Sequence, residues 1–248
     1  MTSDPTSLTG KRVLLTGGTT GIGRATLQLL VAQGARVLTY GRHQEALDSA
    51  LDEFGPAGSG QAFGMIADSA DKAQVDRVFA AVDERLGGID MLVACAALGA
   101  DPLDEMADED WRYVIDTNLV GYLACAKAAI TRMEAQGGGH LLFVGSISTE
   151  IKAPGESVYS ATKAGIQAFA ETLRKEVAER NIRVSVIQPG SVDTDMQECS
   201  DDEKRAAVDR HEMLTATEIA EAIVFVLTRP AGTDVVNLRI EPRLQKTS

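Results

Sequence analysis

The stretch Tyr159-Ser-Ala-Thr-Lys163 places a phenol and an ammonium four positions apart. On a helix, residues i and i+4 share one face, so both groups would point into the same space. A free phenol has a pKa of about 10 and exchanges protons poorly near neutrality. A nearby ammonium lowers that pKa toward the range that a general acid or base needs. The pair therefore predicts acid–base chemistry, although the same spacing also occurs where both side chains are simply solvated.

A glycine-rich turn from Gly17 to Gly23 follows an apolar stretch, 11–16, and precedes a helical pattern over 24–33. Glycines let the backbone approach a pyrophosphate, whose charge then lies at the N-terminus of the following helix. A glycine cluster can also be no more than a flexible turn. Its position between a buried strand and a helix favours a dinucleotide-binding site.

A second predicted strand, 36–40, ends in Gly41-Arg42-His43, where such a site contacts the adenosine ribose. A carboxylate here would bind a free 2′-hydroxyl and repel a 2′-phosphate. Arg42 instead offers a guanidinium, whose geometry suits a phosphate. This residue favours NADP(H) over NAD(H), the alternative being that Arg42 caps a turn.

Strand and helix patterns alternate along the whole chain, and this alternation predicts the fold class. It is typical of an α/β protein with a three-layer, doubly wound parallel sheet (a Rossmann fold) and helices on both faces. The length of 248 residues suits one domain, 1–248, with an N-terminal tail at 1–10 and a substrate lid at 191–214. The further predicted strands are 61–67, 89–94, 140–145, 182–187 and 234–240, and the further helices are 44–54, 71–86, 108–136, 157–180, 203–210 and 217–227.

Composition excludes several classes of protein. The formal net charge of −12 argues against nucleic acid or an anionic membrane surface as a partner. No apolar run is long enough to cross a bilayer, and the N-terminus does not resemble a signal peptide. The three cysteines, Cys95, Cys125 and Cys199, show neither a disulfide framework nor metal-ligand spacing. We expect a cytoplasmic protein without a metal site.

Taken together, the motifs resemble the short-chain dehydrogenase/reductase family over nearly the whole chain. The stretch from Thr16 to Gly23 looks like the family's TGxxxGIG loop, and Tyr159 to Lys163 looks like its YxxxK motif. Four further features match in order: the helix asparagine (Asn118), the serine thirteen positions before the tyrosine (Ser146), the acidic residue that contacts adenine (Asp68), and the segment that holds the nicotinamide carboxamide (Pro189-Gly190 to Thr194).

The resemblance implies hydride transfer between NADP(H) and a small ketone, aldehyde or secondary alcohol. Tyr159 would exchange the proton, Ser146 would bind the reacting oxygen, and Lys163 would lower the pKa of Tyr159 and bind the nicotinamide ribose. Asn118 would position a water, although a satisfied core amide is an equal interpretation of this residue. Homodimers or homotetramers through the long helices are also implied. The cofactor-binding residues would be Gly17, Thr19, Gly21, Ile22, Gly23, Arg42, Asp68, Ser69, Ala96, Tyr159, Lys163, Pro189, Gly190, Val192 and Thr194.

One motif departs from the family pattern, because Ala94-Cys95-Ala96-Ala97 stands where Asn-Asn-Ala-Gly is usual. The lost amides could weaken support between strands, and Ala97 could crowd the nicotinamide side. Two alternatives therefore stay open: an NADP(H)-binding sensor or regulatory protein without turnover, and a structural subunit that binds no cofactor.

The substrate pocket is predicted to lie among residues 98–103, 147–157 and 191–214. Lys152 would attract a carboxylate there or be simply solvated, whereas the acidic start of the lid opposes a strongly anionic substrate.

Overall fold

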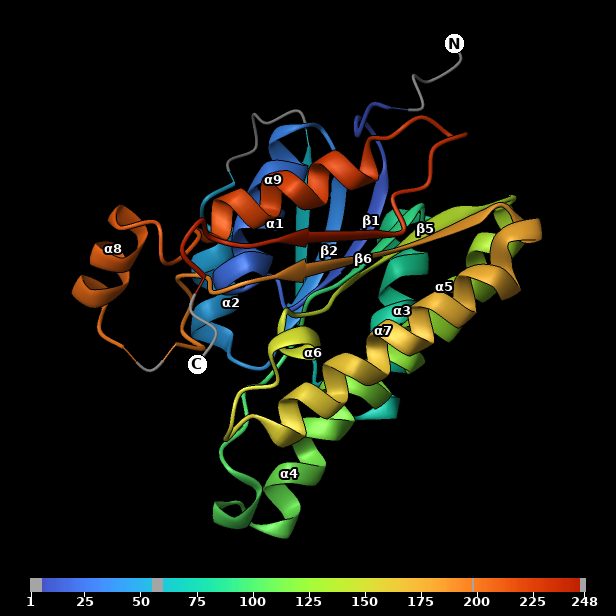
Figure 1. Cartoon of the computed structure of the whole chain (residues 1–248). Coiled ribbons are helices and arrows are strands. Elements are labelled where there is room, and N and C mark those ends of the chain that lie inside the picture. The colour runs from blue at the N-terminus through green and yellow to red at the C-terminus, as the bar shows by residue number, and fades with distance from the viewer. Residues whose placement is uncertain (1–5, 55–59, 198, 246–248) are drawn as a thin grey trace.

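A computed structural model describes residues 6–54, 60–197 and 199–245, and at its centre lies a parallel sheet of seven strands (Figure 1). The strand order is β3-β2-β1-β4-β5-β6-β7. The chain thus builds the sheet outward from β1 in one direction and returns to β4 to build it in the other. Ligands of such sheets bind where this direction reverses, at the carboxyl ends of the strands. The strands are β1 (Arg12–Thr16), β2 (Arg36–Gly41), β3 (Gln61–Ile66), β4 (Met91–Ala94), β5 (Gly139–Val144), β6 (Ile182–Pro189) and β7 (Asn237–Ile240).

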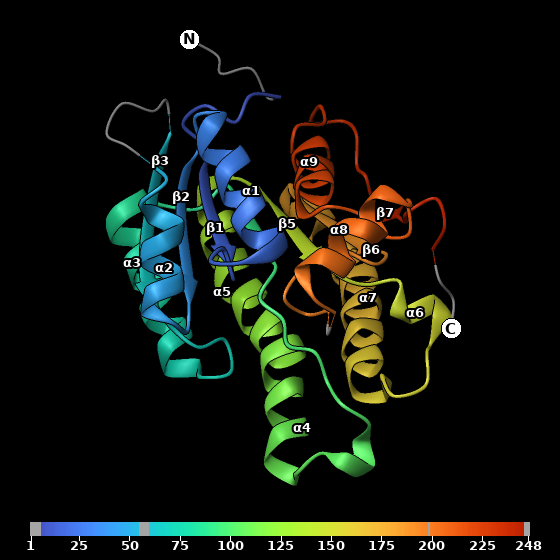
Figure 2. The same cartoon turned by 90° about the vertical axis from the view of Figure 1, so that its left-hand side faces the viewer.

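Helices cover both faces of the sheet, as Figures 1 and 2 show. The α-helices are α1 (Gly21–Ala32), α2 (Gln44–Leu51), α3 (Lys72–Leu86), α4 (Asp108–Ile115), α5 (Gly121–Gln136), α6 (Ser148–Ile151), α7 (Ser157–Val177), α8 (Asp201–Asp209) and α9 (Ala216–Leu227). Short helices of other kinds are η1 (Leu103–Glu105), η2 (Asp116–Val120) and η3 (Ala178–Arg180). The predicted fold class is confirmed.

Two apolar cores lie on opposite faces of the sheet, because side chains alternate along each strand. In β1, Val13 and Leu15 face the core shared with α1 and α9. Leu14 faces the core shared with α3, α5 and α7. Leu8 is 2% exposed and belongs to the first core, so this part of the predicted N-terminal tail is packed against the protein.

The structure corrects several predicted boundaries. The helix predicted over 108–136 is interrupted by η2, a π-helical turn, and such turns often occur at functional sites. The short helix α6 was not predicted, because four residues are too few to show a period. Helix α2 ends at Leu51, and β7 begins at Asn237 instead of residue 234. Most of the connection between the predicted helix 44–54 and the predicted strand 61–67 lies outside the described residues.

Among the described helices, none is long and apolar enough to cross a membrane.

Candidate active site

A cleft of about 1010 Å³ runs along the carboxyl ends of the strands. Every residue predicted to bind the cofactor lines it, and so do three of the four predicted catalytic residues. Their roles stay predictions, but they share one space. The predicted residues that line the cleft are Gly17, Thr19, Gly21, Ile22, Gly23, Arg42, Asp68, Ser69, Ala96, Ser146, Tyr159, Lys163, Pro189, Gly190, Val192 and Thr194.

The glycine turn between β1 and α1 has no room for side chains. A Cβ added to Gly17 would lie 2.7 Å from Cα of Ala96, and one added to Gly23 would lie 2.0 Å from the carbonyl oxygen of Gly17. Gly17 and Gly21 also have positive φ angles of 70° and 49°, which favour glycine. The turn therefore brings bare backbone to the N-terminus of α1, and this arrangement fits a pyrophosphate.

The unusual segment after β4 is held by a hydroxyl from the neighbouring strand. Thr16 Oγ1 accepts hydrogen bonds from the backbone N–H groups of Cys95 (3.0 Å) and Ala96 (2.9 Å). Support between β1 and β4 therefore persists without the family's two asparagines. Cys95 lines the cleft, and burial raises the pKa of its thiol to about 11, so the thiol stays protonated near neutrality.

At the adenosine end of the cleft, Tyr113 of α4 connects Arg42 with Asp68. Arg42 Nη1 donates a hydrogen bond to the Tyr113 hydroxyl (2.9 Å), and that hydroxyl donates to Asp68 Oδ2 (2.5 Å). The Arg42 guanidinium carbon also lies 5.7 Å from the centre of the Tyr113 ring. The alternative that Arg42 caps a turn finds no support, because its guanidinium donates its hydrogen bond to Tyr113 of α4 and not to the backbone of a turn.

At the other end of the cleft, the hydroxyl of Ser146 is oriented by its own loop. The backbone N–H of Ser148 donates to Ser146 Oγ (3.1 Å), which leaves the serine proton free to be donated. Burial raises the pKa of Tyr159 to about 12, and a hydrogen bond with Ser146 opposes that rise. The predicted lowering of the Tyr159 pKa is therefore wrong for the protein alone, because burial is the largest influence and the neighbouring Glu156 and Cys95 raise the pKa further.

Lys163 is fully buried beside Tyr159. Its Nζ donates to the carbonyl oxygen of Val144 (2.9 Å) and lies 5.5 Å from the centre of the Tyr159 ring. Burial lowers the pKa of Lys163 to about 8. The buried ammonium thus lies beside the half-buried phenol at the cleft, and the interpretation of a solvated pair on an exposed helix is wrong.

Asn118 is the one predicted catalytic residue that does not line the cleft. It lies in η2 with its amide facing the segment after β4. Its Oδ1 accepts from the N–H of Leu98 and its Nδ2 donates to the carbonyl of Leu98, both at 2.8 Å. Its side chain therefore fixes the backbone of the segment after β4.

The segment after β6 is held in place by hydrogen bonds with Gln245 near the C-terminus. Gln245 Oε1 accepts from the N–H of Ser191 (2.9 Å), and its Nε2 donates to Ser191 Oγ (3.1 Å). Of the predicted lid, Ser191, Val192 and residues 194–197 line the cleft, whereas α8 does not and projects to one side in Figure 1.

Sequence analysis did not identify Thr16 as an anchor, nor Tyr113, Ser148 or Gln245. Only Thr16 carries a signal that could have been used, since it ends a strand directly before the glycine turn. Lys152 is exposed and is not among the residues that line the cleft, which favours its interpretation as a solvated side chain.

The family model described as short chain dehydrogenase matches residues 11–205. The chain belongs to the short-chain dehydrogenase family. The resemblance stated from the motifs is thus confirmed, and the protein is an oxidoreductase of this family.

Curated relatives match almost end to end. An uncharacterized oxidoreductase of Staphylococcus haemolyticus is 32% identical over 96% of this chain and 99% of its own length. The 3-oxoacyl-[acyl-carrier-protein] reductase FabG of Salmonella typhimurium is 33% identical over 91% of this chain and 93% of its own length.

Solved structures agree with the fold. An L-sorbose reductase from Gluconobacter frateurii, complexed with NADPH and L-sorbose, has a TM-score of 0.87 and 26% identity, covering 98% of this chain and 99% of its own. A short chain dehydrogenase from Burkholderia cenocepacia, in complex with NADP, has a TM-score of 0.84 and 29% identity, covering 95% of this chain and 98% of its own.

Proposed function

We propose that this protein is an NADP(H)-dependent oxidoreductase that interconverts a small ketone or aldehyde and the corresponding alcohol, with Tyr159 as general acid and base. The observation that carries the proposal is that one cleft has residues suited to bind the cofactor at one end and residues suited to proton transfer at the other. Arg42 and the glycine turn lie at one end, and Ser146, Tyr159 and Lys163 lie at the other. That the solved structures described above hold NADPH or NADP supports the choice of cofactor.

The chain fits this cofactor along the length of the cleft. The glycine turn would hold the pyrophosphate at the N-terminus of α1. Arg42 would bind the 2′-phosphate, and Asp68 with Ser69 would contact the adenosine. Lys163 and the segment from Pro189 to Thr194 would hold the nicotinamide half. The bound cofactor supplies the hydride, and the protein supplies placement and proton transfer.

In the reducing direction, Tyr159 would give its proton to the carbonyl oxygen, and Ser146 would donate a hydrogen bond to the same oxygen. A pKa of about 12 keeps Tyr159 protonated at neutral pH, so the proton to be given is present on the phenol of the protein alone. Ser148 N–H donates to Ser146 Oγ, and the serine hydroxyl still has its own proton to donate to the substrate oxygen. Asn118 would act by holding the segment from Cys95 to Leu98 against the cleft.

The substrate side of the cleft favours an uncharged carbonyl compound. Asp101, Glu156 and Asp195 line it, and no lysine or arginine does so outside the adenosine end and the buried Lys163, as far as the described residues go. A carboxylate or phosphate on the substrate would meet only like charges there. The predicted pocket segments up to Gln197 contribute to this side, and we propose that the whole segment 191–214 acts as its lid.

We also propose a cytoplasmic homodimer or homotetramer that buries Val120 and Leu123. These apolar side chains at η2 and the start of α5 are 49% and 37% exposed. Light scattering on the purified protein should give a mass of two or four chains, and a mass of one chain would contradict this.

The test is a titration with NADPH and with NADH, followed by turnover on uncharged and carboxylate-bearing ketones and aldehydes. We expect tighter binding of NADPH and oxidation of it by uncharged carbonyls. Tight binding without turnover would favour the sensor, and binding of neither cofactor would favour a structural subunit.

A further inference from the structure

Next to the adenosine end of the cleft lies the side chain of Tyr113, which has no role in the function proposed above. Tyr113 does not line the cleft but lies behind two residues that do, Arg42 and Asp68. It is half-buried on α4, whereas Arg42 is exposed on the turn after β2. The three side chains come from segments that are 45 and 71 positions apart.

The Tyr113 hydroxyl makes both hydrogen bonds that a phenol is best suited to make. It accepts from Arg42 Nη1 at 2.9 Å and donates to Asp68 Oδ2 at 2.5 Å. Within the described residues no direct ion pair joins Arg42 to Asp68, so the phenol oxygen stands between the two opposite charges. Burial and the hydrogen bond to Asp68 raise the pKa of Tyr113, so the hydroxyl keeps the proton that this arrangement requires.

This position has two consequences for Arg42. An exposed arginine side chain is flexible and loses conformational entropy when it is fixed on a ligand. The hydrogen bond at Nη1 and the ring at 5.7 Å fix the guanidinium in advance. A guanidinium carries five N–H donors, so the remaining ones stay available to a phosphate. Without the phenol, Asp68 would be free to pair with Arg42 directly and to compete with that phosphate.

We infer that Tyr113 is a positioning residue for cofactor selectivity: it separates Arg42 from Asp68 and holds the guanidinium ready for the 2′-phosphate of NADP(H). The inference rests on the proposed use of NADP(H). The two hydrogen bonds have separable effects. The bond to Arg42 concerns only a cofactor with a 2′-phosphate, whereas the bond to Asp68 concerns the adenosine that NADPH and NADH share.

The experiment is a double-mutant cycle on the full-length protein with four forms: wild type, Tyr113→Phe, Arg42→Ala and the combination. Dissociation constants for NADPH and NADH are measured by calorimetry. Trp111→Phe is the matched control, because Trp111 makes its hydrogen bond to Asp108 within α4 and does not bond to Arg42 or Asp68. Thermal unfolding of each variant reports whether the fold is kept.

We expect Tyr113→Phe to weaken NADPH binding about 3- to 10-fold, the loss of one hydrogen bond to a charged group. NADH binding should change less than about 2-fold, so the preference for NADPH falls. In the Arg42→Ala background the same substitution should leave the preference unchanged, because the group through which Tyr113 acts is gone. Trp111→Phe should leave both constants as in the wild type.

The inference is overturned if Tyr113→Phe keeps the wild-type preference, or lowers it equally with and without Arg42. Those results leave the proposed function intact as long as the wild type prefers NADPH. A wild type that binds both cofactors equally, or neither, would contradict the proposed function and this inference together.

Discussion

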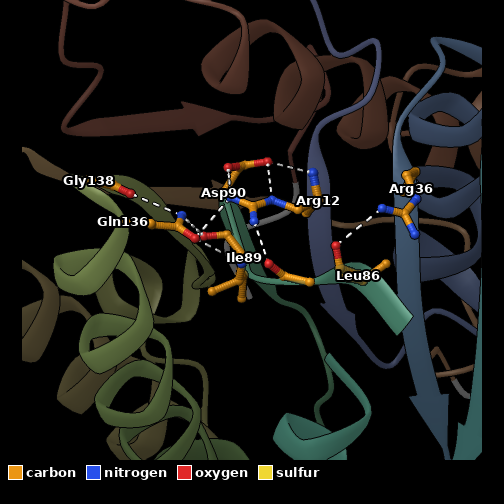
Figure 3. Close-up of polar contacts among 8 residues, drawn as sticks. Arg12, Arg36, Leu86, Ile89, Asp90, Gln136 and Gly138 are labelled. Atoms are coloured by element: carbon orange, nitrogen blue, oxygen red, sulfur yellow. Dashed lines mark hydrogen bonds and ion pairs between the residues drawn. The ribbon is translucent and has the colours of Figure 1, made fainter. Parts of the chain in front are cut away.

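The amino ends of the parallel strands form one side of the sheet, the amino edge, and their carboxyl ends form the opposite side, the carboxyl edge. These two sides carry similar polar residues in opposite arrangements. At the amino edge, Figure 3 shows Arg12 of β1 facing Asp90, with Gln136 beside them. Arg12 Nε and Nη2 donate to the two carboxylate oxygens of Asp90 at 3.0 and 2.7 Å, and Nη2 also donates to Gln136 Oε1 at 2.9 Å. This network ties β1 to the start of β4 and the end of α5, and its charges are paired with one another.

At the carboxyl edge the polar groups around Ser146, Tyr159 and Lys163 face a cleft. Nζ of Lys163 is hydrogen-bonded to a backbone carbonyl, with no carboxylate in an ion pair with it among the described residues. The residues Ser148 and Thr117 line the cleft, and their buried hydroxyl oxygens have no hydrogen-bond partner in the described part of the chain. The polar residues at this edge therefore lie where a ligand in the cleft could meet them.

The pKa values of the buried groups differ between the two edges in the same sense. Burial would raise the pKa of Asp90, but the hydrogen bonds from Arg12 hold it below its usual range. At the carboxyl edge burial lowers the pKa of Lys163 to about 8 and raises that of Tyr159 to about 12. At the amino edge the Arg12–Asp90 pair is held in its charged form, whereas at the carboxyl edge Lys163 and Tyr159 are shifted toward their uncharged forms.

The largest expected effect comes from Lys163→Met, which should separate activity from stability. We expect kcat/KM to fall at least about 100-fold. Because the folded protein holds the ammonium at a pKa below the unfolded value, its charge opposes folding below about pH 8, and this cost is relieved as the pH rises from 8 toward 10.5. The free energy of unfolding at pH 7 should therefore stay the same or rise by roughly 1–3 kcal/mol.

Kinetics and urea denaturation measure the two quantities. Lys175→Met is the control, because Lys175 is 65% exposed and pairs with Glu171 on the surface. A large loss of stability in Lys163→Met would contradict the contrast between the edges.

His140 at the start of β5 should make the amino half of the sheet sensitive to acid. The His140 side chain is 2% exposed, and its Nε2 lies 2.9 Å from Ser185 Oγ. Burial lowers the pKa of His140 to about 3. The unfolded chain binds a proton near pH 6.5, so this stability is fully present above pH 6.5 and is lost as the pH falls toward 3. By pH 4.5 the loss should reach roughly 2–3 kcal/mol.

Denaturant midpoints from pH 7 to 4.5 check this prediction. His140→Gln should remove most of the decrease in the denaturant midpoint between pH 7 and 4.5. Replacement of the exposed His43 should leave that decrease unchanged. A decrease that survives in His140→Gln would assign the acid sensitivity elsewhere.

Asp90→Asn should reverse the result of Lys163→Met. Loss of the charge-assisted pair with Arg12 should lower the free energy of unfolding by about 1–3 kcal/mol. The kcat/KM should stay within about twofold of the wild type, because Asp90 lies at the far edge from the cleft. Asp76→Asn, on a 62% exposed carboxylate paired with Lys72, should cost less than about 0.5 kcal/mol. Equal losses in the two variants would argue against the amino-edge network.

The smallest expected effect tests the segment that closes the cleft. Gln245→Ala removes both hydrogen bonds to Ser191, so the loop after β6 should be held less firmly. The KM for NADPH should rise about 2- to 10-fold with a stability loss below about 1.5 kcal/mol. Gln245→Glu keeps the acceptor for Ser191 N–H and should be intermediate. An unchanged KM in both variants would leave Gln245 without a role in the site.

Much of this could be predicted from sequence because the signals are local. A buried strand, a glycine turn and a helix are contiguous from 11 to 33, and Tyr159 and Lys163 lie one helical turn apart. The Arg42–Tyr113–Asp68 bridge and the Gln245–Ser191 pair join residues that lie 45 to 71 positions apart, so only packing brings them together. The pKa of Tyr159 was missed for a similar reason, since i+4 spacing reveals the neighbouring charge but not the depth of burial.

The central claim is that Tyr159 exchanges the proton while the cofactor is held by other residues. The most direct test is the rate of NADPH oxidation by an uncharged ketone in the wild type and in Tyr159→Phe, both at saturating NADPH confirmed by calorimetry. The account predicts a fall in kcat of about 100- to 10,000-fold with NADPH binding nearly unchanged. Near-normal turnover by Tyr159→Phe would contradict it.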